Sequence, residues 1–282
     1  MSSLLSLRNA DLASTLKSLQ CEVRDNPSEP KHRIFLFQLL CILGQWERAL
    51  GQLNVLRDLN AESLSLVQTY QETLNCEALR ADVFAGKRSP LLFGEPESWM
   101  ALMLESLKLF GQGKESEAAT MRDNALQDAP TASGTVSLFP EKKSTDEAAT
   151  VESFPFEWMA DADSRIGPFL ETIINGRYFW IPFHRIRSMV LEKVSDLRDL
   201  VWLPARFEWA NGGETVGFIP TRYVDSQTHS DDHVRLGWKT LWNQIGEGTF
   251  VGLGQRLLAT DTDEYALTKI QKIEFNMSDM HG

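Results

Sequence analysis

The chain has 282 residues, of which 43% are apolar and 24% charged, a composition typical of a globular protein with one or two domains. Its 28 basic residues are outnumbered by 39 acidic ones, which gives a formal net charge of −11. We therefore expect neither nucleic acid nor a membrane as the main partner, since nucleic acid and anionic lipid both attract basic surfaces.

The N-terminus and the cysteines favour a cytoplasmic location. The first twelve residues lack the basic and then apolar pattern of a signal peptide. Cys21, Cys41 and Cys76 show no Cys-x-x-Cys spacing, and three thiols cannot pair completely, so we expect small buried side chains. The most apolar run, residues 34–43, is half the length of a membrane helix and predicts a buried helix instead.

The first 130 residues have the apolar spacing of consecutive helices. Asn9 or Asp11 is a candidate cap for the first helix, and Asn26-Pro27 ends it. A loop is expected over residues 86–96, where two prolines and two glycines fall. The predicted helices cover about 10–24, 28–43, 46–56, 62–84, 97–110 and 115–128.

Part of this pattern repeats after 34 residues, the period of tetratricopeptide repeats. At that offset three apolar positions of the first helix match Trp46, Leu50 and Leu53, and GQWERAL (44–50) is similar to the turn and second helix of such a repeat. Glu115 replaces the tryptophan in a later echo at 113–119. Such arrays bind peptides or helices on a curved face. The alternative is an irregular bundle. As a fully buried wedge, Trp46 would contribute ~3–5 kcal/mol.

The composition changes after residue 130. Residues 131–153 are rich in Ser, Thr and Ala and predict a flexible linker. Residues 154–282 hold eighteen aromatic residues against nine in 1–153, and six of the eight tryptophans. We therefore expect three parts: a tetratricopeptide-like helical domain at 1–130, the linker at 131–153, and an aromatic-rich α+β domain at 154–282.

Short strands and tight turns predominate in the third part. One helix is expected over 165–174. Asn211-Gly212-Gly213 predicts a hairpin between two of the strands, and residues 260–263 predict a turn. These patterns favour a small, mostly antiparallel sheet, so the fold class of the whole chain is α+β. The predicted strands cover 177–183, 201–209, 216–220, about 248–259 and about 266–275.

Two groups of side chains suggest chemistry, each with a plainer alternative. His229-Ser-Asp-Asp-His233 places two imidazoles four residues apart, which on a helix could hold a divalent metal. Its polar flanks favour a solvated loop without metal. Asp161 and Asp163, with His184, could support acid–base catalysis. We favour helix initiation, with Asp163 or Ser164 as a cap and acidic residues stabilising the first turn.

No sequence motif predicts a cofactor site. Gly248, Gly252 and Gly254 lack the third glycine of a dinucleotide fingerprint, and neither a phosphate loop nor a Gly-x-Ser-x-Gly elbow is present. His184-Arg185-Ile-Arg187 is a small basic group after a strand, for which a salt-bridged sheet edge is favoured over an anion site. We therefore expect no cofactor, no metal and no enzymatic activity.

Four long segments of the chain carry a resemblance to a known family. They read FLFQLLCILGQWERALGQLNVL (35–56), ALRADVFAGKRSPLLFGEPESWMALM (78–103), PFEWMADADSRIGPFLETIINGRYFWIPFHRI (155–186) and DLRDLVWLPARFEWANGGETVGFIPTRY (196–223). In this order they resemble the ImpE/TagJ family, accessory proteins of bacterial type VI secretion. Two departures are a longer passage at 137–152 and the His-Ser-Asp-Asp-His segment, which has no counterpart in the family pattern.

The resemblance implies a non-catalytic cytoplasmic adaptor. Family members are similar in binding the N-terminal helix of the small contractile-sheath subunit, and they are linked to sheath turnover by a sheath-disassembling AAA+ ATPase. Two alternatives stay open at this point: a general tetratricopeptide-like scaffold with a different protein partner, and an enzyme that uses Asp161, Asp163 and His184. The partner-binding residues and the oligomeric state are not predicted.

Overall fold

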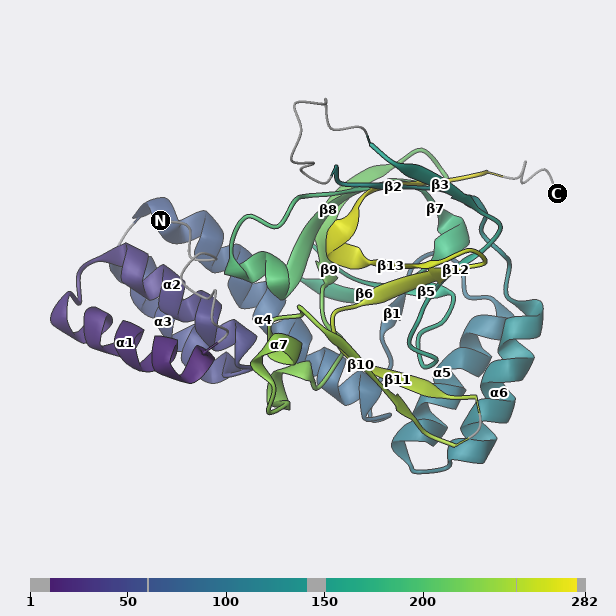
Figure 1. Ribbon diagram of the computed structural model, residues 1–282, viewed down its shortest axis with the longest axis horizontal. Coiled ribbons are helices and arrows are strands. Elements are labelled where there is room, and N and C mark those ends of the chain that lie inside the picture. The colour runs from purple at the N-terminus through teal and green to yellow at the C-terminus, as the bar shows by residue number, and fades with distance from the viewer. Residues whose placement is uncertain (1–10, 60, 141–150, 247, 278–282) are drawn as a thin grey trace.

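The computed structural model describes residues 11–59, 61–140, 151–246 and 248–277. Six α-helices lie in the first 130 residues, before every strand of the main sheet except β1, and α5 and α6 lie apart from α1, α2 and α3 in Figure 1. None of the helices among these residues is long and apolar enough to cross a lipid bilayer. The helices are α1 (Leu12–Asp25), α2 (Pro30–Ile42), α3 (Trp46–Leu59), α4 (Leu64–Phe84), α5 (Ser98–Gly111) and α6 (Glu115–Asp128).

These six helices were predicted to within a few residues, and α1 and α2 have local start signals, a capping side chain at Asp11 and at Glu29. The Asp11 side chain caps α1 by accepting from the Ser14 backbone N–H, and Asn26 ends that helix. Gly44 turns the chain between α2 and α3 with φ +65°. A side chain there would collide with Gln227, since its Cβ would lie 2.3 Å from the Gln227 Cγ. The turn of the predicted repeat therefore packs against the C-terminal half of the protein.

Most of the strands form one large curved sheet, which confirms the α+β class. Among the described residues it has nine strands in the order β1-β6-β5-β9-β8-β7-β14-β2-β3, antiparallel except for β1 beside β6. Two smaller sheets, β13-β12-β4 and β10-β11, accompany it (Figure 1). The strands are β1 (Leu91–Leu92), β2 (Gly134–Leu138), β3 (Ser153–Phe156), β4 (Met159–Asp161), β5 (Phe169–Ile174), β6 (Arg177–Pro182), β7 (Ile186–Leu191), β8 (Trp202–Trp209), β9 (Glu214–Pro220), β10 (Thr240–Gln244), β11 (Phe250–Gly254), β12 (Leu257–Thr260), β13 (Glu264–Ala266) and β14 (Ile270–Phe275).

The helix predicted over residues 165–174 is wrong, because strand β5 occupies its second half. All six residues of β5 are buried. Phe169 and Ile173 pack in a core that the sheet shares with the helices, while Leu170 and Ile174 pack in a second core on the other face. A strand covered on both faces has no apolar–polar alternation with a period of two, and apolar residues at both ends of a short segment do not distinguish a strand from a helix.

The flexible linker predicted over 131–153 is also wrong in part. Residues 134–138 form β2, which pairs with β14 on one side and β3 on the other. Val136 is completely buried, while Thr135 and Ser137 lie on the half-exposed face. The residues at 141–150 lie outside the described part of the chain.

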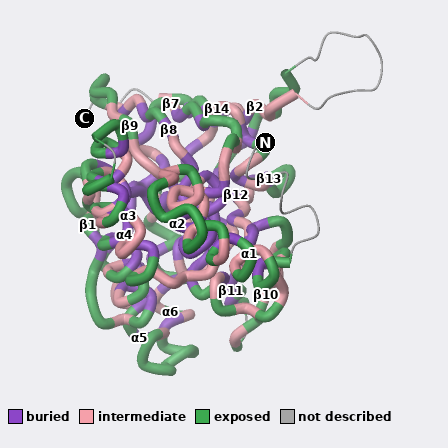
Figure 2. The backbone as a smooth tube through the Cα atoms, turned by 90° about the vertical axis from the view of Figure 1, so that its left-hand side faces the viewer, coloured by how far each residue is buried: buried purple, intermediate pink, exposed green. Residues whose placement is uncertain are grey.

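The helical and sheet-rich parts share one core, although we expected them to be separate domains. Most of its buried residues come from α1–α6 and others come from β5, β6 and β8, and in Figure 2 buried backbone runs through the middle of the molecule. A second core lies on the opposite face of the sheet and includes β2, β12 and β14. The boundary at residue 130 therefore does not separate two hydrophobic cores.

Two tryptophans join the helical repeats to the sheet. Trp202 of β8 is completely buried, and its indole N–H donates to the Glu77 Oε1 atom of α4 at 2.7 Å. Trp46 of α3 is only half-buried and lies against it, with 6.0 Å between ring centroids. Trp46 is therefore an interface residue between helices and sheet, and the tetratricopeptide-like character of the helices stays a prediction.

We predict that Trp202→Ala lowers the free energy of unfolding by ~3–5 kcal/mol, since it leaves a cavity at the helix–sheet interface and removes the hydrogen bond to Glu77. Trp46→Ala should cost less, because that side chain is already partly in water. Urea unfolding of both variants measures the two losses. An equal or larger loss for Trp46→Ala would contradict the assigned packing.

Candidate functional site

The carboxylates considered for catalysis are sealed inside the protein. Asp161 pairs with Arg256, and Asp163 pairs with Arg165 at 2.7 Å between Oδ2 and Nη2. No described helix begins directly after Asp163, so the predicted helix cap is wrong. The Asp163 carboxylate instead accepts hydrogen bonds from the backbone N–H groups of Arg165 and Gly252. Both acids are at most 3% exposed. They hold the fold together and do not face a substrate.

Glu171 lies at the centre of this group of buried charged side chains. From β5 its carboxylate accepts hydrogen bonds from the Arg80 guanidinium of α4, with Nε–Oε1 at 2.7 Å and Nη2–Oε2 at 3.1 Å. It also pairs with Arg256, which precedes β12, and accepts a hydrogen bond from the Tyr178 hydroxyl of β6. One side chain thereby links a helix to three separate parts of the sheet region.

The surrounding charges balance. We call the set the buried ionic cluster: four arginines and four acids, each with a side chain at most 8% exposed. Burying an unpaired charge costs several kcal/mol, so acids placed beside the arginines reduce the cost of enclosing these groups. Arg222 contributes by donating to the Ile42 carbonyl at the end of α2. The members are Glu77, Arg80, Asp161, Asp163, Arg165, Glu171, Arg222 and Arg256.

Two pKa values in the cluster move in opposite directions. Burial acts to raise the pKa of Glu171, but the Arg80 and Arg256 guanidinium groups outweigh it and lower that pKa to about 2. Burial raises the pKa of Asp161 to about 7 against the attraction of Arg256, and the charge of Asp163 adds to the rise. Asp161 therefore titrates near neutral pH while Glu171 stays ionised.

His184 lies apart from the predicted catalytic set. Its Nε2 atom is 3.1 Å from Glu97 Oε1, and the neighbouring Arg185 binds the same carboxylate at 2.6 Å. Arg185 also donates to the carbonyls of Phe93 and Glu95 and so holds the loop before α5. This basic group is salt-bridged as expected, but β7, which begins at Ile186, lies inside the sheet and not at its edge.

The two histidines of the His-Ser-Asp-Asp-His segment make hydrogen bonds within the segment. His233 lies on a four-residue helix, α7 (Asp232–Arg235), and is exposed, while His229 accepts a hydrogen bond from the Asp231 backbone N–H. The described residues contain no cluster of three metal-binding side chains. The segment instead anchors the first helix, because Asp232 Oδ2 accepts from the Leu12 backbone N–H at 3.0 Å.

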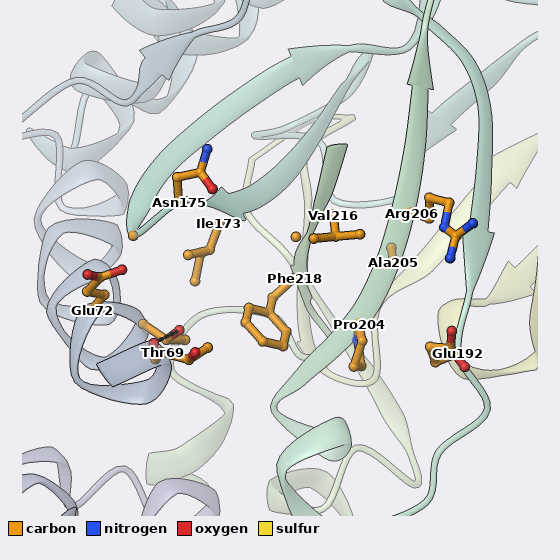
Figure 3. Close-up of a pocket in the computed structure, with 13 residues that line it drawn as sticks. Thr69, Glu72, Ile173, Asn175, Glu192, Pro204, Ala205, Arg206, Val216 and Phe218 are labelled. Atoms are coloured by element: carbon orange, nitrogen blue, oxygen red, sulfur yellow. Dashed lines mark hydrogen bonds between the residues drawn. The ribbon is translucent and has the colours of Figure 1, made fainter. Parts of the chain in front are cut away.

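Of several open cavities in the described part of the chain, one of about 410 Å³ lies between α4 and the sheet, and we call it the α4–β9 groove. Figure 3 shows Glu72 and Thr69 on the helix at one side, Arg206 and Glu192 at the other, and Phe218 between them. The lining residues are Thr69, Glu72, Thr73, Ile173, Asn175, Gly176, Glu192, Pro204, Ala205, Arg206, Val216, Gly217 and Phe218.

The groove has the composition of a polypeptide-binding surface. Its floor is apolar, and Glu72, Glu192 and Arg206 around it are exposed and form no ion pair within the described part of the chain. An apolar floor surrounded by unpaired charged side chains is a surface that a segment of another protein can bind. The sequence shows no signal for this site, because its residues come together only through the packing of α4 beside β8 and β9.

Comparison with known proteins supports a role in secretion. A family model described as ImpE protein matches residues 153–274. The chain is 45% identical over 273 residues to the type VI secretion system accessory component TagJ of Pseudomonas aeruginosa, covering 97% of this chain and 90% of that protein. A crystal structure of a Vibrio parahaemolyticus protein superposes with a TM-score of 0.83 over 98% of each chain at 22% identity, which shows a shared fold.

We predict that Glu171→Gln lowers the free energy of unfolding by about 3–5 kcal/mol, since it leaves two buried guanidinium groups without their shared counterion. Glu105→Gln is the matched control: Glu105 pairs with Lys108 at the exposed surface of α5, where loss of a pair costs about 0.3–0.5 kcal/mol. Similar urea midpoints for the two variants would contradict the role of Glu171.

We predict that Asp161 makes the protein less stable as pH rises from about 4 to 7. The folded pKa is about 7 and the unfolded one is about 3.9, so in this window the folded state holds a proton that the unfolded state has lost. Asp161→Asn should lack this decline. Urea unfolding of both proteins across the window measures it, and a constant difference would show that Asp161 is ionised throughout.

Proposed function

Because this chain belongs to the ImpE/TagJ family of type VI secretion accessory proteins, we propose that it is a non-catalytic adaptor that binds the N-terminal helix of the small contractile-sheath subunit. The observation that carries this proposal is the 45% identity to an accessory component over 97% of the chain. The similarity extends over both the helical region and the sheet, so it concerns the whole protein.

The chemistry of the interior supports an adaptor. Asp161 and Asp163 are committed to buried ion pairs, and His184 is committed to Glu97. A catalytic acid or base must reach a substrate, and Asp161 and Asp163 are enclosed by protein. The α4–β9 groove, in contrast, offers an open apolar surface with unpaired charges around it.

The helical region supports a helical partner. Val55 and Leu59 are 37% and 43% exposed one turn apart on α3, and Leu64 at the start of α4 is 49% exposed. An amphipathic helix binds by laying its apolar face on such side chains. In this proposal the protein acts in the cytoplasm on the sheath, and its link to the AAA+ ATPase is through the sheath subunit.

We predict saturable heat on calorimetric titration of the protein with a peptide of the sheath subunit's N-terminal helix. The same peptide with a central proline, which breaks the helix, is the control and should give none. Leu59→Asp and Val216→Asp then separate the exposed face of α3 from the groove, since both side chains are exposed and the variants should fold. No heat at high micromolar concentration would favour a scaffold with a different protein partner.

A further inference from the structure

The β8–β9 hairpin extends past the strand on its other side. Antiparallel pairing of β8 with β9 continues from Trp202 opposite Pro220 to Glu208 opposite Glu214. The pairing of β5 with β9 is limited to Ile173 opposite Phe218. Strand β5 ends one residue later, and the chain turns back at Asn175-Gly176 into β6. The outer end of β9 therefore has a neighbouring strand on one side only.

Two hydrogen bonds show which backbone groups of β9 face this open side. The Pro204 carbonyl accepts from the Glu192 N–H at 3.0 Å, so it points toward β7 and not toward its β9 partner. The Trp209 N–H donates to the Gly213 carbonyl at 2.8 Å. Along a strand of an antiparallel pair, the backbone N–H and C=O groups of successive residues point to opposite sides. The backbone groups of Thr215 and Gly217 therefore bond to β8, and those of Glu214 and Val216 point away from β8.

Val216 leaves this edge unprotected. Its side chain is 67% exposed. The Glu214 carbonyl is occupied by the Thr215 hydroxyl at 2.8 Å, but the Val216 N–H and C=O have no hydrogen-bond partner among the described residues. Natural edges usually carry a lysine, a proline or a bulge that prevents pairing with another chain. This one presents free backbone groups and an apolar side chain beside the α4–β9 groove.

We propose that an extended, basic segment of a partner protein adds as a strand to the free edge of β9 at Val216. Backbone pairing supplies affinity in this mode, and pockets for alternate side chains supply specificity. One side chain of the segment enters the groove over Phe218. Among the lining residues of the groove Glu72 and Glu192 are acidic and Arg206 is basic, and Glu214 adds an acid on β9, so lysine or arginine is favoured at the flanking positions. The proposal is independent of the sheath helix.

Val216→Pro tests the backbone directly. The N–H that it removes points away from β8, so the hydrogen bonds between β8 and β9 should remain. Proline is tolerated on edge strands for the same reason. Val216→Ala is the matched control, because it removes the side chain and keeps the N–H. Random peptides displayed on phage are selected on the wild-type protein after depletion on Val216→Pro. Synthetic copies of the enriched peptides are then measured by fluorescence anisotropy.

The expected result is a set of basic peptides with alternating apolar residues. Their affinity should fall at least about tenfold with Val216→Pro and change little with Val216→Ala. Hydrogen exchange of the Val216 amide in the wild-type protein should slow when such a peptide is bound, a readout that does not depend on the folding of any variant.

Three outcomes would overturn the proposal. The first is that no peptide survives depletion, and the second is that both variants weaken binding equally. The third is a concentration-dependent dimer in sedimentation that Val216→Pro abolishes, which would make a second copy of the chain the occupant. Failure of the sheath helix to bind would leave this test unaffected, since it uses different probes.

Discussion

The carboxylate of Glu171, held between the guanidinium groups of Arg80 and Arg256, is the interaction on which the rest of the structure depends. A fully buried charge is stable only when opposite charges reach it in the right geometry. Its partners come from α4, from the segment before β12 and, through the Tyr178 hydroxyl, from β6. These contacts join α4, β6 and the segment before β12 at one buried carboxylate, where the helices and the sheet meet.

That constraint also determines the surface of this type VI secretion accessory protein. One wall of the α4–β9 groove is α4, and its floor is the sheet, so the groove exists because Arg80 and Glu171 hold α4 against β5. The Arg222 guanidinium at the end of α2 and Asp232 at the start of α1 tie the first helices to the same body. A shared core then presents the helical layer and the free edge of β9 in a fixed relation, as suits an adaptor between proteins.

Local features made much of the fold predictable from sequence. Asp11 and Gly44 mark helix ends, and Asn211-Gly212-Gly213 between alternating residues marks the β8–β9 hairpin. Residues 169–174 read as a helix because a strand buried on both faces has no period of two, and residues 134–138 read as a linker because β14 pairs with them from the other end of the chain. Asp161 and Glu171 pair with Arg256, which is also far from them in the sequence, so no local pattern predicts these ion pairs. The groove was not predicted because it depends on where β5 stops beside Val216.

The central claim is that the helical and sheet-rich parts form one cooperative unit through the buried ionic cluster. Native-state hydrogen exchange in low concentrations of urea tests it most directly, by comparing amides in the middle of α4 with amides of β5. We expect the slowest amides of both elements to open with the same free energy and the same urea dependence. Exchange of α4 at a lower free energy, while β5 stays protected, would show two independent domains and contradict it.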